Sequence, residues 1–297
     1  MKSKNKIAVI IPCYNEEITI RNVIMDFKKY IPSAIIYVFD NNSTDNTAKL
    51  AEDSGAIVIK ELRQGKGFVN QAFMEKIEAD IYVTVDGDET YPIKDVNKLI
   101  EPIINQKADM VVGARLVESK KGAFKRMHLF GNKFLTFILN KLFRTKFQDI
   151  LSGFRVLSRN FVENVPLITG GFQTETEMTI QAVEKNMIIL EIPISIKSRP
   201  EGSYAKLRTY RDGVLILLTI AMYLRDHNPL RFFTFIALIW IIITEIILFN
   251  SSFISIDKIL IQMMIIIVVT LLLIVGTMLS AINTRFAELE KNIKKNY

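Results

Sequence analysis

Residues Ile81-Tyr82-Val83-Thr84-Val85-Asp86-Gly87-Asp88 join a short apolar run to a turn that carries two carboxylates. The run Ile81–Val85 has the length and the composition of a buried strand. Two carboxylates one residue apart at a strand end can share one divalent cation, and Mg²⁺ or Mn²⁺ prefers such oxygen ligands. Many surface turns also contain Asp-X-Asp, so it is the preceding strand that makes Asp86 and Asp88 candidate metal ligands.

Similar apolar runs recur on both sides of this strand, with helical patterns between them. The expected strands are Ile7–Ile11, Ala34–Phe39, Ala56–Ile59 and Met110–Val112, and the expected helices are Glu16–Tyr30, Thr44–Ser54, Gly67–Glu78 and Ile93–Asn105. The strands are apolar throughout, as expected when helices cover both faces of a sheet. The alternation predicts an α/β domain with a mostly parallel sheet, in which ligands bind at the carboxyl ends of the strands.

Polar segments follow three of these strands. Residues 12–17 end the first strand and open a helix, and a helix N-terminus suits an anionic ligand. After the second strand, Ser43 or Thr44 can cap the next helix, whereas Asp40 can accept a hydrogen bond from a base or a ribose hydroxyl. Residues 63–67 place a guanidinium and an ammonium on a glycine loop, an arrangement that suits phosphate.

The composition argues against several kinds of site. The 297 residues contain one cysteine, Cys13, and two histidines, His128 and His227. A single cysteine cannot form an internal disulfide or a cysteine-based zinc site, and two histidines argue against a histidine-rich metal centre. Any metal is therefore expected to be a hard cation held by oxygen.

Positive charge gathers in one segment. The chain has 38 basic and 31 acidic residues, a net charge of +7, and residues 119–148 contain eight Lys or Arg but no Asp or Glu. Apolar residues at helical spacing among these cations indicate a helix on an anionic membrane surface or, equally, a core helix with a solvated basic face. Nucleic-acid binding is disfavoured, because the rest of the chain is close to neutral and the segment contains no recognised motif.

The C-terminal third is much more apolar. Residues 232–256 contain one charge, Glu245, and residues 259–282 contain none, so each run exceeds the roughly 20 residues that cross a bilayer. We expect transmembrane helices at about 230–250 and 259–282, with a buried helical pair in a soluble protein as the alternative. A carboxyl group inside a span is costly, so we predict that Glu245 faces a partner helix or another subunit.

Basic residues flank the two spans on one side. Arg225 and Arg231 precede the first span and Arg285 follows the second, whereas the loop between them holds Asp257 and Lys258. The positive-inside rule then places both termini and the α/β domain in the cytoplasm, at the cell membrane. The first apolar run is too short for a signal peptide, which agrees with this orientation.

Taken in chain order, the motifs resemble those of the family 2 glycosyltransferases with a GT-A fold, and within them the polyprenyl-phosphate branch that includes dolichol-phosphate mannose synthases. The matching segments are Ile10–Glu17, Asp40–Asp45, Gly65–Gly67, Asp86–Asp88, Gly113–Arg115, Asp149–Arg155, Phe172–Glu177 and Arg199–Leu207. The resemblance covers about residues 5–225, and the full set is highly specific although each piece is not. It implies a GT-A domain (1–210), and a C-terminal membrane hairpin occurs in several members of the branch. From composition and length we expect a juxtamembrane helix (211–228), two transmembrane helices (229–284) and a basic cytoplasmic tail (285–297).

On the donor side, the resemblance implies a site for a UDP- or GDP-sugar. The residues implied to bind its nucleoside and diphosphate are Pro12, Tyr14, Glu16, Asp40, Lys66, Asp86, Arg199 and Lys206. Arg199 and Lys206 lie on an Arg-Pro-Glu-Gly-Ser loop with the hinge residues of a lid. Asp86 and Asp88 are the implied ligands of Mg²⁺ or Mn²⁺. The mannose synthases have a glutamine where this chain has Thr90, which leaves the third ligand open.

On the acceptor side, the residues implied to bind the phosphate of a polyprenyl phosphate are Arg115, Arg126 and Ser152. Asp149 matches a position with a catalytic role, as a base or as an orienting group. We expect orientation, because a phosphate oxygen is already anionic at neutral pH and needs no strong base. Glu175 and Glu177 either position the hydroxyls of the sugar or cap and charge the start of a helix.

The sequence thus predicts a metal-dependent, membrane-anchored enzyme that transfers a hexose with inversion to undecaprenyl or dolichyl phosphate. One alternative keeps the donor and replaces the acceptor by another lipid or a lipid-linked saccharide. Another is an inactive membrane scaffold with a glycosyltransferase-like domain, which the intact Asp86 and Asp88 disfavour. A homo-oligomer is compatible with Glu245 but is not required by it.

Overall fold

The computed structural model describes residues 5–116, 126–206, 209–249 and 255–296 of the chain. Its internal contacts divide the chain into two compact units, Met1–Thr219 and Ile220–Tyr297. The division falls within α8, Thr209–His227, the helix expected beside the membrane. The domain boundaries expected at residues 210 and 228 stay predictions.

The first unit is built on a seven-stranded sheet in the order β3-β2-β1-β4-β6-β5-β7. The strands are β1 Ile7–Cys13, β2 Ile35–Asp40, β3 Ile57–Lys60, β4 Ile81–Thr84, β5 Met110–Leu116, β6 Arg155–Ser158 and β7 Ile189–Ser195. All neighbouring strands pair in parallel except β6, which is antiparallel to both β4 and β5. The predicted α/β fold with a mostly parallel sheet is confirmed.

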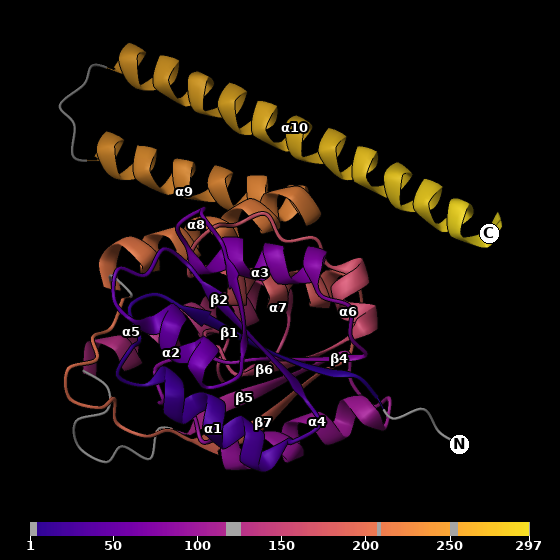
Figure 1. The fold of residues 1–297 in the computed structure, drawn as a ribbon. Helices are drawn as coiled ribbons and strands as arrows, with labels where there is room; N and C mark the ends of the chain where they lie inside the picture. The colour runs from indigo at the N-terminus through magenta and orange to yellow at the C-terminus, as the bar shows by residue number, and fades with distance from the viewer. Residues whose placement is uncertain (1–4, 117–125, 207–208, 250–254, 297) are drawn as a thin grey trace. The chain divides into compact units, whose positions relative to one another are not determined.

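Helices cover both faces of the sheet (Figure 1). One face carries α1 Ile20–Tyr30, α2 Thr47–Asp53, the short 3₁₀ helix Ile93–Asp95 and α4 Val96–Ile104, and the other carries α3 Lys66–Lys76, α6 Arg159–Asn164 and α7 Thr174–Glu184. Neighbouring residues of β1 face opposite ways: Val9 packs in the core with Phe27, and Ile10 packs in the other core with Phe73. Because both faces are buried, the strands are apolar at consecutive positions.

The helix α2 begins at Thr47, three residues later than predicted. Asp45 Oδ1 accepts a hydrogen bond from the backbone N–H of Thr47 at 3.0 Å. The cap expected from Ser43 or Thr44 is wrong, because both residues contact Asn15 instead. Ser43 Oγ accepts from the Asn15 N–H at 3.0 Å, and the Thr44 N–H donates to Asn15 Oδ1 at 2.8 Å. These residues join the segments after β1 and β2.

Helix α5, Arg126–Phe143, lies in the basic segment and has one buried side. Leu135 and Leu139 are buried, whereas Phe134 and Phe137 are 49% and 65% exposed. The interpretation as a core helix is therefore correct for one side of α5. Docking of the other side on a membrane stays a prediction. The described residues exclude Lys120, Lys121 and Lys125.

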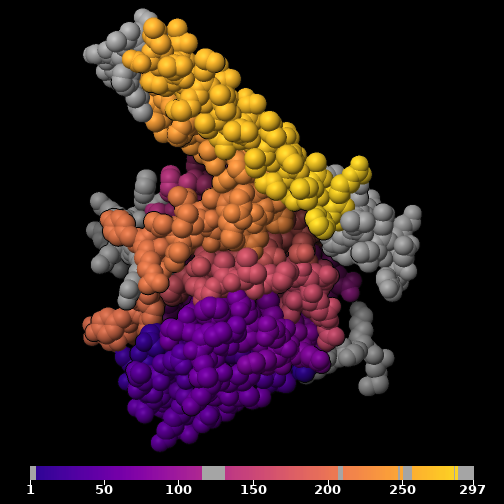
Figure 2. Space-filling model, turned by 90° about the horizontal axis from the view of Figure 1, so that it is seen from above, coloured from indigo at the N-terminus to yellow at the C-terminus, as the bar shows by residue number. Residues whose placement is uncertain are grey.

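The second unit contains two long helices, α9 Pro229–Phe249 and α10 Ser255–Asn296, which lie side by side (Figures 1 and 2). Gly276 of α10 permits this close approach, since a Cβ there would lie 3.2 Å from the Cβ of Phe233. Residues 229–246 and 256–283 are long and apolar enough to cross a membrane, with mean hydropathies of 1.8 and 3.0. The two predicted apolar helices are confirmed, and they indicate a membrane protein.

Glu245 lies four residues before the end of α9, and its side chain is exposed. The predicted contact with the partner helix of the same chain is therefore wrong. At 1.5 Å per residue, Glu245 is about 6 Å from the end of the helix. A contact with another subunit stays a prediction.

Candidate active site

The candidate site lies where the order of the strands reverses. β1 pairs with β2 on one side and with β4 on the other, and at such a switch point the loops after the strands leave room for a ligand. The loops after β1, β2 and β4 meet at this edge. Thr19 Oγ1 donates to the Gly87 carbonyl at 2.6 Å, and the Asn41 N–H donates to the Cys13 carbonyl at 2.8 Å.

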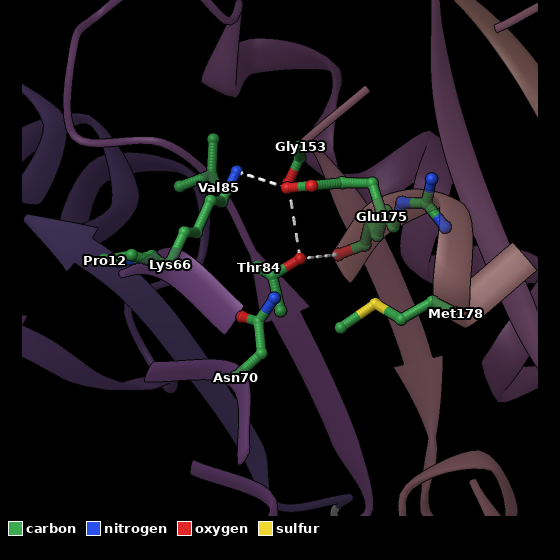
Figure 3. Close-up of a pocket in the computed structure, with 9 residues that line it drawn as sticks. Pro12, Lys66, Asn70, Thr84, Val85, Gly153, Glu175 and Met178 are labelled. Atoms are coloured by element: carbon green, nitrogen blue, oxygen red, sulfur yellow. Dashed lines mark hydrogen bonds and ion pairs between the residues drawn. The ribbon is translucent and has the colours of Figure 1, made fainter. Parts of the chain in front are cut away.

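The ammonium group of Lys66 lies between two carboxylates from different elements. Lys66 opens α3 and forms an ion pair with Asp86. It forms another with Glu175 of α7 at 2.5 Å (Figure 3). Burial lowers the pKa of Lys66, but the two carboxylates outweigh it and raise the pKa above its ordinary value. Lys66 is therefore charged, next to the expected metal ligand Asp86.

Gly67 brings the start of α3 against the loop that precedes α7. Its N–H donates to the Gly170 carbonyl at 3.0 Å, and a Cβ at Gly67 would lie 2.0 Å from the carbonyl oxygen of Thr169. A side chain at this position would push α3 away from the loop. The glycine loop 63–67 thus allows the close approach that brings Lys66 to Glu175.

Asp88 is held by its own turn and by a distant loop. Its Oδ1 accepts hydrogen bonds from the Thr90 hydroxyl at 2.6 Å and from the Thr90 N–H at 3.1 Å, and its Oδ2 accepts one from Arg199. Thr90, which stands where the mannose synthases have a glutamine, therefore orients Asp88. Arg199 also donates to the carbonyl of Tyr204 at 2.9 Å, which holds the loop 199–206 in shape.

The carboxylate oxygens of Asp86 and Asp88 suit a hard divalent cation. Asp86 and Asp88 supply carboxylate oxygens on one tight turn, where a Cβ at Gly87 would lie 2.7 Å from the Sγ of Cys13. Within the described part of the chain, no three His, Cys, Asp or Glu side chains gather as a metal centre. A cation held by two carboxylates takes its remaining oxygens from water or from a substrate phosphate. The residues present therefore fit a cation that binds together with a phosphorylated substrate.

A second ion pair joins the loop 199–206 to the segment after β1. Lys206 Nζ donates to Glu16 Oε1 and to the Asn15 carbonyl, both at 2.9 Å, and the Ser203 hydroxyl lies 3.3 Å from Glu16 Oε2. Burial raises the pKa of Glu16, and the hydrogen bond and charge of Lys206 partly offset that rise. One loop thus supplies cations to two carboxylates of the candidate site.

The other residues expected to bind the nucleoside lie at the same sheet edge. Pro12 is paired with Phe39 in the sheet and lines a narrow pocket with Lys66 (Figure 3). Asp40 is buried at the end of β2, and its Oδ1 accepts from the Ser43 N–H at 3.2 Å. Tyr14 is 38% exposed. An exposed ring and a carboxylate are groups that can stack on a base and hydrogen-bond to it.

Asp149 receives hydrogen bonds from several donors, most of them on Arg115. Oδ2 accepts from the Arg115 Nε at 2.6 Å and from its backbone N–H at 3.1 Å. Oδ1 accepts from Arg115 Nη2 at 2.8 Å, Asn132 Nδ2 at 3.0 Å and the Leu151 N–H at 3.2 Å. Burial alone would raise the pKa of Asp149, but the Arg115 cation and these hydrogen bonds hold it below its ordinary value. Such a carboxylate is a weak base.

Two residues expected to contact substrate have their polar atoms bonded inside the protein. Ser152 is fully buried, and its hydroxyl donates to the Gly113 carbonyl at 2.6 Å. Glu177 is fully buried, and it accepts from the backbone N–H groups of Ile168 and Thr169 at 2.8 and 3.0 Å. Neither side chain is exposed at the surface of the site. Glu177 instead holds the loop before α7.

Two arginines expected to bind phosphate, Arg63 and Arg126, stay predictions. Arg63 pairs with Glu61 at 2.9 Å and its guanidinium lies over the Phe68 ring, 5.0 Å from the centroid. The guanidinium of Arg63 is thus paired with a neighbouring carboxylate in this structure, and its contact with phosphate stays a prediction. The side chain of Arg126 lies outside the described residues.

Three residues that the sequence analysis missed hold the loop that carries Asp149. Arg155 is fully buried and donates to two carbonyls of this loop at 2.8 and 2.9 Å. Glu191 of β7 accepts from the Asp149 N–H at 2.9 Å, and the Tyr91 hydroxyl accepts from the Gly153 N–H at 2.9 Å. Arg155 ends a matched motif and Tyr91 follows the carboxylate turn, so both had a signal in the sequence. Glu191 had none.

The motifs and this geometry agree with a family assignment from sequence comparison. Residues 8–165 match the family described as Glycosyl transferase family 2, which is more than half of the chain. The chain belongs to this family. It is therefore a glycosyltransferase, and the resemblance inferred from the motifs is confirmed.

Relatives of this glycosyltransferase match most of its length. It is 33% identical to the glycosyltransferase AglJ of Haloferax volcanii over 234 residues, which covers 78% of this chain and 77% of that protein. It is 32% identical over 217 residues to a UDP-N-acetylglucosamine–dolichyl-phosphate N-acetylglucosaminyltransferase of Methanococcus voltae, with 63% of this chain and 84% of that protein covered.

A solved structure shares the fold of the first unit. Glucosyl-3-phosphoglycerate synthase of Mycobacterium tuberculosis, in complex with Mn²⁺, UDP and glucosyl-3-phosphoglycerate, superimposes with a TM-score of 0.62 at 22% identity. The match covers 74% of this chain and 81% of that chain. It supports the GT-A fold that the motifs predict.

Proposed function

We propose that this glycosyltransferase moves a hexose from a UDP- or GDP-sugar to a polyprenyl phosphate, with inversion at the anomeric carbon. One observation carries the proposal: Lys66 and Arg199 pair with the two carboxylates of the Asp86–Asp88 turn. A cation and a diphosphate that bind together replace both partners of these ion pairs at once. The relative in M. voltae, which by its name transfers N-acetylglucosamine from UDP-N-acetylglucosamine to dolichyl phosphate, supports the same donor and acceptor classes.

On the donor side, Asp86 and Asp88 would hold Mg²⁺ or Mn²⁺, which supplies charge neutralisation of the leaving nucleotide diphosphate. Lys66, Arg199 and Lys206 bind its phosphate oxygens, since charge-assisted hydrogen bonds to phosphate are strong. Tyr14, Pro12, Asp40 and Glu16 bind the nucleoside at the ends of β1 and β2. Glu175 contacts the sugar or holds Lys66 in place.

On the acceptor side, Arg115 orients the phosphate of the lipid, and Asp149 orients Arg115. The attacking phosphate oxygen is already anionic, so the reaction needs no strong base. This agrees with the lowered pKa of Asp149 and with its many hydrogen bonds. Arg126 and Ser152 complete the proposed phosphate contacts, and for Ser152 this requires its hydroxyl to leave the Gly113 carbonyl.

The membrane brings the lipid acceptor to the enzyme. We infer that α9 and α10 cross the cell membrane as a pair, with the catalytic unit and both termini in the cytoplasm, because the basic flanks lie on that side. The exposed Phe134 and Phe137 and the lysines of the segment 119–148 then dock on anionic lipid. Each lysine or arginine near such a surface contributes about 1 kcal/mol.

The test is turnover by the purified full-length protein in detergent. It is supplied with Mg²⁺ or Mn²⁺, a short polyprenyl phosphate and a panel of UDP- and GDP-sugars, and a glycolipid product is sought. A metal-dependent product that Asp88→Asn abolishes supports the proposal and identifies the donor. Nucleotide diphosphate binding without product points to another acceptor, and neither product nor binding in folded protein supports the inactive scaffold.

A second arm separates an anionic acceptor from a hydroxyl acceptor. A lipid or saccharide hydroxyl has to lose a proton during transfer, so its enzyme needs a base. With a phosphate acceptor, Asp149→Asn keeps measurable turnover well above that of Asp88→Asn. Loss of activity to the level of Asp88→Asn would favour Asp149 as a base and a hydroxyl acceptor.

A further inference from the structure

Tyr91 links two parts of the candidate site that come from distant stretches of the sequence. It lies three residues after Asp88 and is 4% exposed. Its hydroxyl oxygen accepts a hydrogen bond from the Gly153 N–H at 2.9 Å, and its ring packs edge-on against Phe154 with 5.6 Å between centroids. The tyrosine thus joins the carboxylate turn to the loop 149–154.

Gly153 lies directly against that turn. A Cβ at Gly153 would lie 2.6 Å from Asp86 Oδ2 and 2.7 Å from Lys66 Nζ, so the backbone there leaves no room for a side chain. The same loop begins with Asp149, which binds Arg115 on the acceptor side. A small movement of this loop therefore shifts Asp149 relative to the Asp86–Asp88 turn.

We propose that Tyr91 is a positioning residue, whose hydroxyl fixes the loop 149–154 against the Asp86–Asp88 turn and so aligns acceptor with donor. The proposal rests on the proposed function. The hydroxyl is the group that matters, because a phenylalanine would fill the same space beside Phe154. Without the hydroxyl, the buried Gly153 N–H loses this acceptor, which favours a displaced loop. A displacement of about 1 Å at reacting groups is enough to lower a rate about a hundredfold.

The test compares Tyr91→Phe with Tyr82→Phe in the full-length protein. Tyr82 is 3% exposed, and its ring packs beside Phe73. Its hydroxyl accepts from the Ala79 N–H at 2.9 Å and donates to the Ile77 carbonyl at 3.0 Å. Each variant removes one hydroxyl from a buried tyrosine that accepts a backbone N–H. Both variants thus remove the acceptor of a backbone N–H, and Tyr82→Phe also removes a donor to a backbone carbonyl. Of the two tyrosines only Tyr91 contacts the candidate site.

The first readout is hydrogen exchange without ligand, which needs no enzyme activity. We expect the peptides that cover residues 149–154 to exchange about tenfold faster in Tyr91→Phe than in the wild type. Tyr82→Phe should leave the exchange of these peptides unchanged. Equal exchange of this loop in Tyr91→Phe and the wild type would overturn the proposal.

The second readout separates alignment from donor binding. Tyr91→Phe should lower kcat about ten- to a hundredfold while the affinity for Mn²⁺ with UDP or with GDP, measured by calorimetry, changes less than about twofold. Tyr82→Phe should keep kcat near the wild-type value. An affinity loss as large as the loss of kcat would overturn the alignment role. If the wild type transfers no sugar at all, the proposed function fails, and the exchange comparison still decides whether Tyr91 holds the loop.

Discussion

Arg199 donates a hydrogen bond to Asp88, which lies 111 positions earlier in the chain. The cation of the loop 199–206 therefore contacts a carboxylate that we assign to a divalent metal ion. Lys66 likewise forms an ion pair with Asp86, and Lys206 forms one with Glu16. Without ligand, each cation expected to bind diphosphate is paired with a carboxylate expected to bind metal or nucleoside. Under the proposed function, donor binding therefore requires an exchange of partners.

Replacement of Arg199 by glutamine should affect metal binding in opposite directions with and without nucleotide. Mn²⁺ alone should bind several-fold tighter, because Asp88 loses a competing cation. Mn²⁺ together with UDP or GDP should bind about tenfold weaker, because a charge-assisted hydrogen bond to phosphate is lost. Calorimetric titrations measure both, with the exposed Lys197→Gln as control. Weaker binding of Mn²⁺ in both titrations would contradict the exchange of partners.

Replacement of Lys66 by methionine should destabilise the first unit by about 3–5 kcal/mol, because it leaves the buried Glu175 without its cation. Lys98 provides a control, since its side chain is 71% exposed and pairs with Asp95 at 2.7 Å. Lys98→Met should change the free energy of unfolding by less than about 0.5 kcal/mol. Denaturant unfolding measures both variants, and equal small effects would show that the buried ion pairs of Lys66 contribute little.

Asp149 should make folding stability depend on acid pH. Its pKa in the folded protein lies below the ordinary value of 3.8, so the unfolded chain binds the proton first as the pH falls. The stability that the ionised carboxylate contributes is thus present above the ordinary pKa and is lost as the pH falls through the lowered one. Asp149→Asn should therefore lower Tm at pH 7 more than at about pH 3. If Asp149→Asn lowered Tm equally at both pH values, the predicted contribution of the ionised carboxylate would be contradicted.

Replacement of Glu177 by glutamine should reduce stability and leave the donor KM unchanged. The glutamine amide has one acceptor oxygen, so one of the Ile168 and Thr169 N–H groups loses its partner, at a cost of about 1–3 kcal/mol. The exposed Glu163→Gln of α6 serves as control. An increased donor KM without loss of stability would show instead that Glu177 positions the sugar.

Replacement of Glu245 by leucine should change the assembly of the protein in detergent. Its carboxyl group is exposed on an apolar helix, where a contact with another subunit would compensate its cost. Light scattering of the purified protein measures the mass of the assembly, and Ile242→Leu on the same helix is the control. Unchanged assembly and unchanged turnover in Glu245→Leu would remove the argument for an oligomer.

Local pattern was sufficient to predict most of the fold. The run Ile81–Val85, the turn with Asp86 and Asp88 and the two apolar helices depend on residues close together in the chain, so hydrophobic periodicity and turn residues reveal them. The late start of α2 also has a local cause, because neighbouring polar side chains compete for the first N–H of the helix. α2 begins late because Asp45, rather than Ser43 or Thr44, binds the first N–H of the helix.

The sequence by itself determined the fold class, the family and the set of charged residues at the strand ends, because these depend on composition and order. Only the tertiary structure decided which charges meet. It pairs Lys66 with Asp86 and Glu175, saturates Asp149 with donors, turns Ser152 and Glu177 inward and brings the Tyr91 hydroxyl to Gly153. Many of these partners lie dozens of residues apart, so their contacts follow from the strand order and from close packing at glycines, which no local pattern encodes.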